Sequence, residues 1–358
     1  MVRKIRVGMI GASWWGELMF VPALHSHENA ELVAIASRNA EAGTDFAQRH
    51  GIARHFTDYR EMLRDGGLEA VIVATPDDQH RDMTLAALDA WLHVLCEKPL
   101  ALNSADAEIM LRRAEASGRV HLINYTWRWQ PCFQYLKALV DGGYVGRPLR
   151  AQFSFAGGWA HERNYQWRQD GERANGVLGD LGSHMIELSN WIIGRATSVS
   201  AHTPVLIDRA GFDGRTPRPA NDTAHLTLTY ANGAEGVIDV TTLTHLAGDV
   251  RLGARIDGTG GSVALDFEPL GPNAGAHLSG MRLGETGVLP LPIPPEFEAT
   301  PPEAHMDIYQ QRSVGARLFI DAILSGVQPT PGFAEGLAVQ RVIDAALISH
   351  RERRWVDL

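Results

Sequence analysis

The run Ile5-Arg6-Val7-Gly8-Met9-Ile10-Gly11-Ala12-Ser13-Trp14-Trp15-Gly16 near the start of the chain decides its fold. Ile5–Ile10 is a short apolar run typical of a buried strand, and Trp15–Ser26 has the spacing of a helix. The turn between them matches the pattern GxGxxG, with a serine in place of the middle glycine. In this pattern glycines allow a tight turn and close packing, and the helix N-terminus offers N–H groups to phosphate oxygens. The turn predicts dinucleotide binding rather than a plain glycine loop, with contacts from Gly11, Ala12, Ser13, Trp14 and Trp15.

Outward from this turn, short apolar strands alternate with helices as far as residue 124. We expect strands at 5–10, 32–37, 70–74, 93–96 and 120–124, and helices at 15–26, 39–50, 59–64, 79–90 and 104–117. Strands that are apolar on both faces and separated by helices are typical of a parallel sheet covered on both sides. Residues 1–124 are therefore predicted to form a doubly wound Rossmann domain.

The pattern changes after about residue 148, where polar and apolar residues alternate. We expect strands at 149–156, 197–207, 223–231, 235–246 and 251–257, with a hairpin at Asn232-Gly233 and one helix over 183–193. Residues 269–304 are rich in proline and glycine and predict a long surface excursion, and helices are expected at 307–325 and 333–350. Residues 125–358 are thus predicted to form a second, α+β domain with an open, mostly antiparallel sheet. Its last helices can pack back on the Rossmann domain. These helices cover one sheet face, so a second subunit is expected on the other, in a homodimer or homotetramer.

Composition narrows the class of protein. The chain has 358 residues, of which 33 are Lys or Arg and 42 Asp or Glu, a net charge of −9. No basic stripe suited to nucleic acid is present, and the run Arg351–Arg354 predicts a solvated helix end. Cys96 and Cys132 are expected to be buried, reduced thiols, with no spacing suited to a metal site. No secretory leader or membrane-length apolar stretch is visible, so a soluble cytoplasmic protein is expected.

The end of the second strand bears on the choice of cofactor. Sites for NAD normally place a carboxylate there, which binds the ribose 2′-hydroxyl. Here the strand is followed by Ser37-Arg38-Asn39, without a carboxylate. A serine hydroxyl and a guanidinium suit a 2′-phosphate, so NADP is favoured and NAD stays possible. The alternative is that Arg38 is an exposed charge at a strand end.

Two further strand ends belong to the same edge of the sheet. One carries Thr75 and Pro76, followed by His80, and the next carries Glu97-Lys98-Pro99. Because the carboxyl ends of parallel strands face the cofactor crevice, Thr75, Pro76, His80, Glu97 and Lys98 are candidate contacts. Pro99 is a candidate cis proline. Taken alone, Lys98 is equally compatible with an exposed lysine.

A second constellation lies at Gly179-Asp180-Leu181-Gly182-Ser183-His184. In a helix, Leu181, Met185, Leu188 and Ile192 share one face, and Asp180 and His184 lie together on another. A carboxylate beside a histidine can fix its tautomer and stabilise its protonated form, as a general base requires. The alternative is that Asp180 caps the helix and His184 lies at the surface.

The motifs GASWWG at 11–16, ATP at 74–76, EKP at 97–99 and GDLGSH at 179–184, in this order, resemble those of the Gfo/Idh/MocA oxidoreductases. The resemblance extends to Asn124-Tyr125 and Arg128 and covers nearly the whole chain. It implies reversible oxidation of a hydroxyl of a sugar, cyclitol or related polyol by NAD(P). By the same resemblance the catalytic residues are Lys98, Asp180 and His184. It also implies cofactor contacts from Asn124, Trp167, Arg168 and Tyr309, and a substrate pocket lined by Tyr125, Arg128, Trp159, His161 and Tyr165, for each of which ordinary packing is the alternative.

The ordinary pKa values of histidine and lysine suggest how these residues divide the work. His184 can accept a proton near neutral pH, whereas Lys98 stays charged and favours the alkoxide that develops as hydride leaves. Asp180 would hold the imidazole or a substrate hydroxyl. Two other functions use the same fold: an NAD-dependent glycoside hydrolase or lyase that oxidises its substrate transiently, and a non-catalytic, cofactor-sensing regulator.

Overall fold

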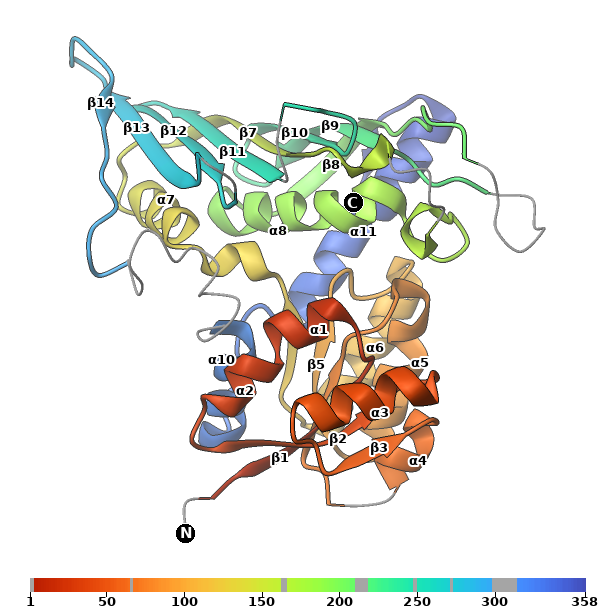
Figure 1. Ribbon diagram of the computed structural model, residues 1–358. Coiled ribbons are helices and arrows are strands. Elements are labelled where there is room, and N and C mark those ends of the chain that lie inside the picture. Colours follow the sequence, from red (N-terminus) through yellow and green to blue (C-terminus); the bar gives the residue numbers. More distant parts are fainter. Residues whose placement is uncertain are drawn as a thin grey trace. The chain divides into compact units, whose positions relative to one another are not determined.

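The computed structural model describes residues 3–64, 67–161, 166–209, 218–246, 250–270, 273–297 and 314–358. The chain forms two compact units (Figure 1). The first comprises the chain as far as Thr126 and a later segment that ends at Leu337. The second begins at Trp127 and includes the final stretch Ala338–Leu358. In the described part of the chain, no helix has both the length and the apolar character needed to cross a bilayer.

The first unit contains a parallel sheet in the order β3-β2-β1-β4-β5-β6. Its strands are β1 (Ile5–Ile10), β2 (Ala30–Ala36), β3 (Arg54–Phe56), β4 (Ala70–Val73), β5 (His93–Glu97) and β6 (His121–Asn124). The strand order reverses at β1, so the crevice at the carboxyl ends opens beside the first turn. The predicted Rossmann fold is confirmed. The edge strand β3 was not predicted, because three half-exposed residues carry no hydrophobic pattern.

The helices of this unit are α1 (Trp14–Met19), α2 (Val21–His25), α3 (Ala40–Arg49), α4 (Tyr59–Arg64), α5 (His80–Asp89), α6 (Ser104–Ser117) and α10 (Val314–Ser325). A short 3-10 turn, η1 (Asp77–Gln79), leads into α5. The single helix expected over 15–26 is wrong, because α1 ends before Pro22. Proline has no N–H for the preceding turn, and here it stands in the first turn of α2 instead.

The described residues of the second unit form one sheet in the order β14-β13-β12-β11-β7-β10-β9-β8-β15. Its strands are β7 (Pro148–Gly157), β8 (Ala196–His202), β9 (Thr223–Tyr230), β10 (Glu235–Thr241), β11 (Val250–Gly258), β12 (Gly261–Glu268), β13 (Gly275–Arg282), β14 (Leu289–Pro290) and β15 (Val356–Asp357). All neighbours pair antiparallel except β7 and β10. The mostly antiparallel sheet is confirmed. The surface excursion expected over 269–304 is wrong in part, since β13 and β14 lie within it, and β12 was missed.

Helices α7 (Pro131–Asp141) and α8 (Ser183–Ile192) cover one face of this sheet, as Figure 1 shows, and α11 (Phe333–Glu352) follows α10. Buried and outward-facing residues alternate along β9 and β10, which accounts for the alternation in the sequence. The face away from α7 and α8 carries exposed polar side chains, among them His225, Glu235, Asp239, Arg251 and Arg255.

Candidate functional site

The first turn is built so that only glycine fits at its start. Gly11 has a φ of 108°, and a Cβ there would overlap the carbonyl oxygen of Ala74 at the end of β4. Ser13 caps α1, with its Oγ accepting a hydrogen bond from the backbone N–H of Gly16 at 3.1 Å. The serine that replaces the middle glycine is therefore a helix cap. Trp14 is exposed, and its ring meets the ring of Trp15 edge-on at 5.4 Å.

The carboxylate of Glu97 joins three segments of the crevice edge. Its Oε1 accepts hydrogen bonds from the Trp15 indole Nε1 at 2.9 Å and from Asn124 Nδ2 at 2.6 Å. Its Oε2 accepts one from the backbone N–H of Lys98 at 3.2 Å. Trp15 and Asn124 come from the first turn and from the end of β6. Glu97 is buried, so this network fixes the backbone that carries Lys98.

The fit of a dinucleotide to this edge can be judged from exposure and from unused polar atoms. Gly11, Ala12, Ser13, Thr75, Pro76 and Lys98 are all partly exposed along it. Asn124 is buried, and in the described part of the chain its Oδ1 has no hydrogen-bond donor. A turn that admits no side chain at Gly11 and a row of partly exposed residues suit a pyrophosphate, so these residues fit the group.

His80 is a buried link between two loops of the crevice edge. It is fully buried, with Nδ1 at 2.8 Å from the carbonyl oxygen of Pro99 and Nε2 at 2.9 Å from that of Thr75. The ring links the two loops from inside, and a direct cofactor contact by His80 stays a prediction. The bond between Lys98 and Pro99 is cis, as the sequence suggested.

At the end of β2 the hydroxyl of Ser37 donates to the carbonyl oxygen of Asn39 at 3.2 Å. Asn39 in turn caps α3 by accepting from the N–H of Ala42. Arg38 is exposed, and no ion pair of its guanidinium is seen within the described residues. A cationic group without a carboxylate at this strand end is compatible with a 2′-phosphate.

The GDLGSH motif folds as a π-helical turn, η5 (Leu178–Gly182), that leads directly into α8. Such turns are rare and frequently occur at functional sites. Asn221 holds the start of this turn: its Oδ1 accepts from Leu178 N–H and its Nδ2 donates to the Asn175 carbonyl, both at 2.9 Å. Asp180 is thus inside the turn, and the alternative that it caps a helix is wrong.

Asp180 and His184 have different surroundings within the second unit. The Asp180 carboxylate forms an ion pair with Arg168, with Nε and Oδ2 at 3.7 Å. The His184 ring is buried, 6.3 Å from the Trp127 ring and 6.4 Å from that of Phe155. The alternative that His184 is a surface residue is therefore wrong. The Arg168 guanidinium also lies over the Trp167 ring, 4.3 Å from its centroid, so these two residues pack together beside Asp180.

Two predicted substrate residues are buried. The Arg128 guanidinium forms an ion pair with the carboxylate of Glu187 and lies 4.4 Å from the centre of the Trp191 ring. Tyr125 is fully buried. Direct substrate contact by either residue stays a prediction.

The remaining predicted residues are partly described. Trp159 and His161 lie in the 3-10 turn η3 (Trp159–His161) after β7, where His161 Nε2 lies 2.7 Å from the Leu243 carbonyl and its ring stacks on His245. Tyr165 and Tyr309 fall outside the described residues. Lys98 belongs to the first unit, and Asp180 and His184 belong to the second.

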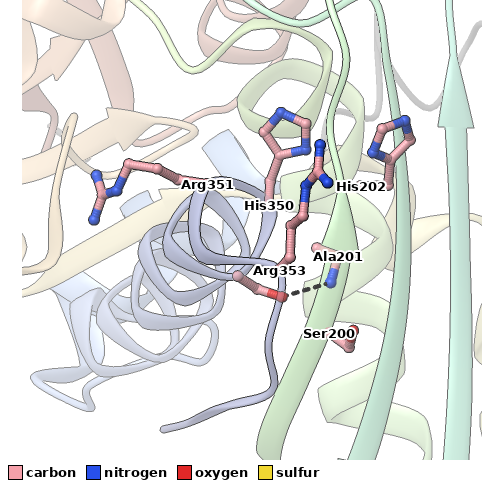
Figure 2. A pocket seen from close by; sticks show the side chains of 7 residues that line it. Ser200, Ala201, His202, His350, Arg351 and Arg353 are labelled. Atoms are coloured by element: carbon pink, nitrogen blue, oxygen red, sulfur yellow. Dashed lines mark hydrogen bonds between the residues drawn. The ribbon is translucent and has the colours of Figure 1, made fainter.

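A hollow of about 600 Å³ lies between β8 and the C-terminal end of α11 (Figure 2). It is lined by His202, His350, Arg351 and Arg353, and by none of the predicted site residues. Basic side chains at a helix C-terminus offset the negative end of its dipole, which accounts for their presence here. The hollow thus lies at the end of a helix, and the sequence predicted a helix end at Arg351–Arg354.

Two residues and one pairing that matter to the site were missed. Asn221, Glu187 and the pairing of Trp15 with Glu97 each depend on contacts between residues at least 43 positions apart. A polar residue in an otherwise apolar helix face, as Glu187 is in α8, was the one signal available.

Comparisons with known proteins show the family and the fold of the chain. Residues 5–125 match the profile of the Gfo/Idh/MocA oxidoreductase family, described as an NAD-binding Rossmann fold, and residues 133–264 match the family's C-terminal domain. Levoglucosan dehydrogenase of Pseudarthrobacter phenanthrenivorans is 26% identical over 100% of this chain and 99% of its own. D-apiose dehydrogenase of Rhizobium rhizogenes is 25% identical over 92% of this chain and 91% of its own.

A solved structure of levoglucosan dehydrogenase in complex with NADH and levoglucosan superposes with a TM-score of 0.89. The two sequences are 25% identical, and the superposition covers 99% of each chain. The likeness in fold therefore extends over nearly the whole chain. The chain belongs to the Gfo/Idh/MocA family of oxidoreductases, whose named relatives are dehydrogenases and reductases.

Proposed function

We propose that this protein is an NAD(P)-dependent dehydrogenase or reductase that acts on a hydroxyl or carbonyl carbon of a sugar or related polyol. The observation that carries the proposal is the presence of both halves of the chemistry. One is a glycine turn and Glu97-held loop around Lys98, and the other is Asp180 and His184 on a π-helical turn. Named relatives acting on levoglucosan and D-apiose support a carbohydrate substrate.

The residues that would hold the dinucleotide are the 11–16 turn, Thr75, Pro76 and Asn124. When bound, the nicotinamide would supply the hydride acceptor. His184 then takes the proton of the substrate hydroxyl, and the Lys98 ammonium stabilises the negative charge that develops on the oxygen. Asp180 favours the protonated imidazole or binds a neighbouring hydroxyl. This mechanism requires Lys98 and His184 to converge on one substrate oxygen, each within about 3 Å.

A panel of sugars and polyols that includes levoglucosan and D-apiose, tested with NADP and with NAD, is the direct test. Accumulation of reduced nicotinamide, followed by its absorbance, is the expected result. Bond cleavage without net cofactor reduction would favour the hydrolase or lyase that oxidises transiently. Cofactor binding with no turnover of any compound would favour the regulator.

Cofactor preference should depend on Arg38. We expect NADPH to bind more tightly than NADH, and Arg38→Ala to remove most of that difference, because a charge-assisted contact contributes about 1.5–3 kcal/mol. Titration of the apoprotein by fluorescence measures both affinities. Arg112→Ala, which removes an exposed guanidinium from α6 with its side chain 75% exposed, is the control and should leave the preference unchanged. Equal affinities for NADPH and NADH in the unmodified protein would refute the NADP preference. A relative solved in complex with NADH makes this comparison necessary.

Assembly should follow from the sheet of the second unit. Its polar face, which includes His225, Asp239 and Arg255, is expected to pair with the same face of a second copy in a symmetric dimer or a tetramer. Light scattering at micromolar concentration measures the mass in solution. A monomeric mass would contradict this assembly.

A further inference from the structure

At the described crevice edge, the ring of His80 contacts two loops at once. Its Nε2 meets the carbonyl oxygen of Thr75, the residue after the carbonyl that packs against Gly11. Its Nδ1 meets the carbonyl oxygen of Pro99, the residue after Lys98. The ring thus joins the loop that backs the glycine turn to the loop that carries the predicted catalytic lysine.

The chemistry of the two contacts defines the charge of the ring. A carbonyl oxygen only accepts hydrogen bonds, so a ring nitrogen at 2.8 or 2.9 Å from one must carry a proton. Neutral imidazole has one N–H and one lone pair, and in either tautomer the lone pair would face an oxygen. Turning the ring over would place carbon atoms where the nitrogens now lie and would lose both bonds. Only the doubly protonated ring satisfies this geometry.

We propose that His80 is a buried imidazolium that acts as a positioning residue, holding the Lys98 loop in register with the glycine turn. The inference rests on the proposed function for its catalytic meaning. The charge, however, follows from the geometry alone. Two charge-assisted hydrogen bonds offset part of the cost of burying the cation, and they are stronger than bonds from a neutral ring.

The surroundings of the ring agree with this assignment. Burial by itself lowers the pKa of His80, but the Cys96 sulfur on β5 and the two carbonyl oxygens outweigh it and raise the pKa to about 9. Cys96 is the titratable group that acts on the ring from the neighbouring strand, and from the Thr75 and Pro99 loops it is faced by carbonyl oxygens. The proton is therefore retained throughout the neutral range.

His121 provides a matched contrast within the same unit. It is also buried, but its Nδ1 accepts a hydrogen bond from the backbone N–H of Phe333 at 3.1 Å, and burial lowers its pKa to about 4. His121 is therefore neutral at pH 8, with one ring proton, whereas His80 should have two.

The first experiment reads the protons directly. Proton–nitrogen correlation spectra of the histidine rings in the full-length protein at pH 8 should show one ring with both nitrogens protonated. That signal should be absent in His80→Gln and retained in His121→Gln. A His80 ring with a single N–H at pH 8 would overturn the proposal. Assignment through bonds in the unmodified protein decides the question even where His80→Gln does not fold, and the spectra need no substrate, so they are independent of the proposed activity.

The second experiment reads the coupling to stability. The pKa of His80 in the folded protein is above its ordinary unfolded value of about 6.5, so its contribution is complete below pH 6.5 and is lost as pH rises through about 9. The difference in melting temperature between the unmodified protein and His80→Gln should narrow over this window. The difference for His121→Gln should stay constant, because that ring remains neutral. Parallel profiles for the two variants would contradict a charged His80.

A third measurement links the clamp to the Lys98 loop. With an active substrate, His80→Gln should lower kcat several-fold more than it raises KM for the cofactor, because it loosens the loop without removing a contact. His80→Gln should also lose the part of the kcat decline near pH 9 that belongs to His80. Unchanged kcat and an unchanged pH profile would show that the imidazolium has no positioning role.

Discussion

Replacing Lys98 or His184 by alanine is expected to lower turnover by about 10²–10⁴-fold while NAD(P)H binding stays nearly intact. In the proposed mechanism, Lys98→Ala removes the charge that stabilises the developing alkoxide, and His184→Ala removes the group that takes the proton. Neither side chain belongs to the turn at 11–16 that would hold the pyrophosphate. Steady-state kinetics on a confirmed substrate and fluorescence titration of the cofactor measure the two effects separately.

Suitable controls lie in the same chain. Lys4→Ala removes an exposed lysine before β1, and His277→Ala removes an exposed histidine from β13, so both should leave turnover unchanged. The two residues belong to different units, and the proposed mechanism requires that both act on one substrate. Full turnover in Lys98→Ala and His184→Ala would rule out the proposed mechanism.

The second large effect is expected at the buried ion pair of the second unit. The side chains of Arg128 and Glu187 are 9% and 3% exposed. Glu187→Ala leaves the Arg128 guanidinium buried without its carboxylate, so the free energy of unfolding should fall by about 3–5 kcal/mol. Arg128→Ala should have a comparable effect, and Arg128→Met combined with Glu187→Leu should recover much of the loss. Urea unfolding of the four proteins gives the comparison.

The exposed pair of Arg112 and Glu108 on α6 is the control for this measurement. Its members are four residues apart with side chains 75% and 37% exposed, so Arg112→Ala should change the stability by no more than about 0.5 kcal/mol. A substrate-binding role for Arg128 predicts the opposite result. In that case Arg128→Ala would raise KM and leave the unfolding free energy within a few tenths of a kcal/mol.

The sequence by itself determined the features that repeat locally. The Rossmann unit followed from apolar runs alternating with helices and from GASWWG, because strand burial and the tight turn impose their patterns on neighbouring residues. The same holds for β9 and β10, whose alternation and Asn232-Gly233 turn predicted a hairpin. The helix break before Pro22 was not predicted, although the missing N–H of proline is a local property.

Only the tertiary structure decided what the polar side chains of the site do. The sequence placed Glu97, His80 and Arg128 near the chemistry. In the folded chain Glu97 accepts a hydrogen bond from Trp15, which lies 82 residues away in the sequence. Arg128 pairs with Glu187, which lies 59 residues away. Asn221 likewise holds a π-helical turn that begins 43 residues earlier. Hydrophobic period specifies which face of an element is buried. The partner of a buried polar group depends instead on which distant element packs against that face, and each such group must find a hydrogen bond there because leaving one unmade is costly.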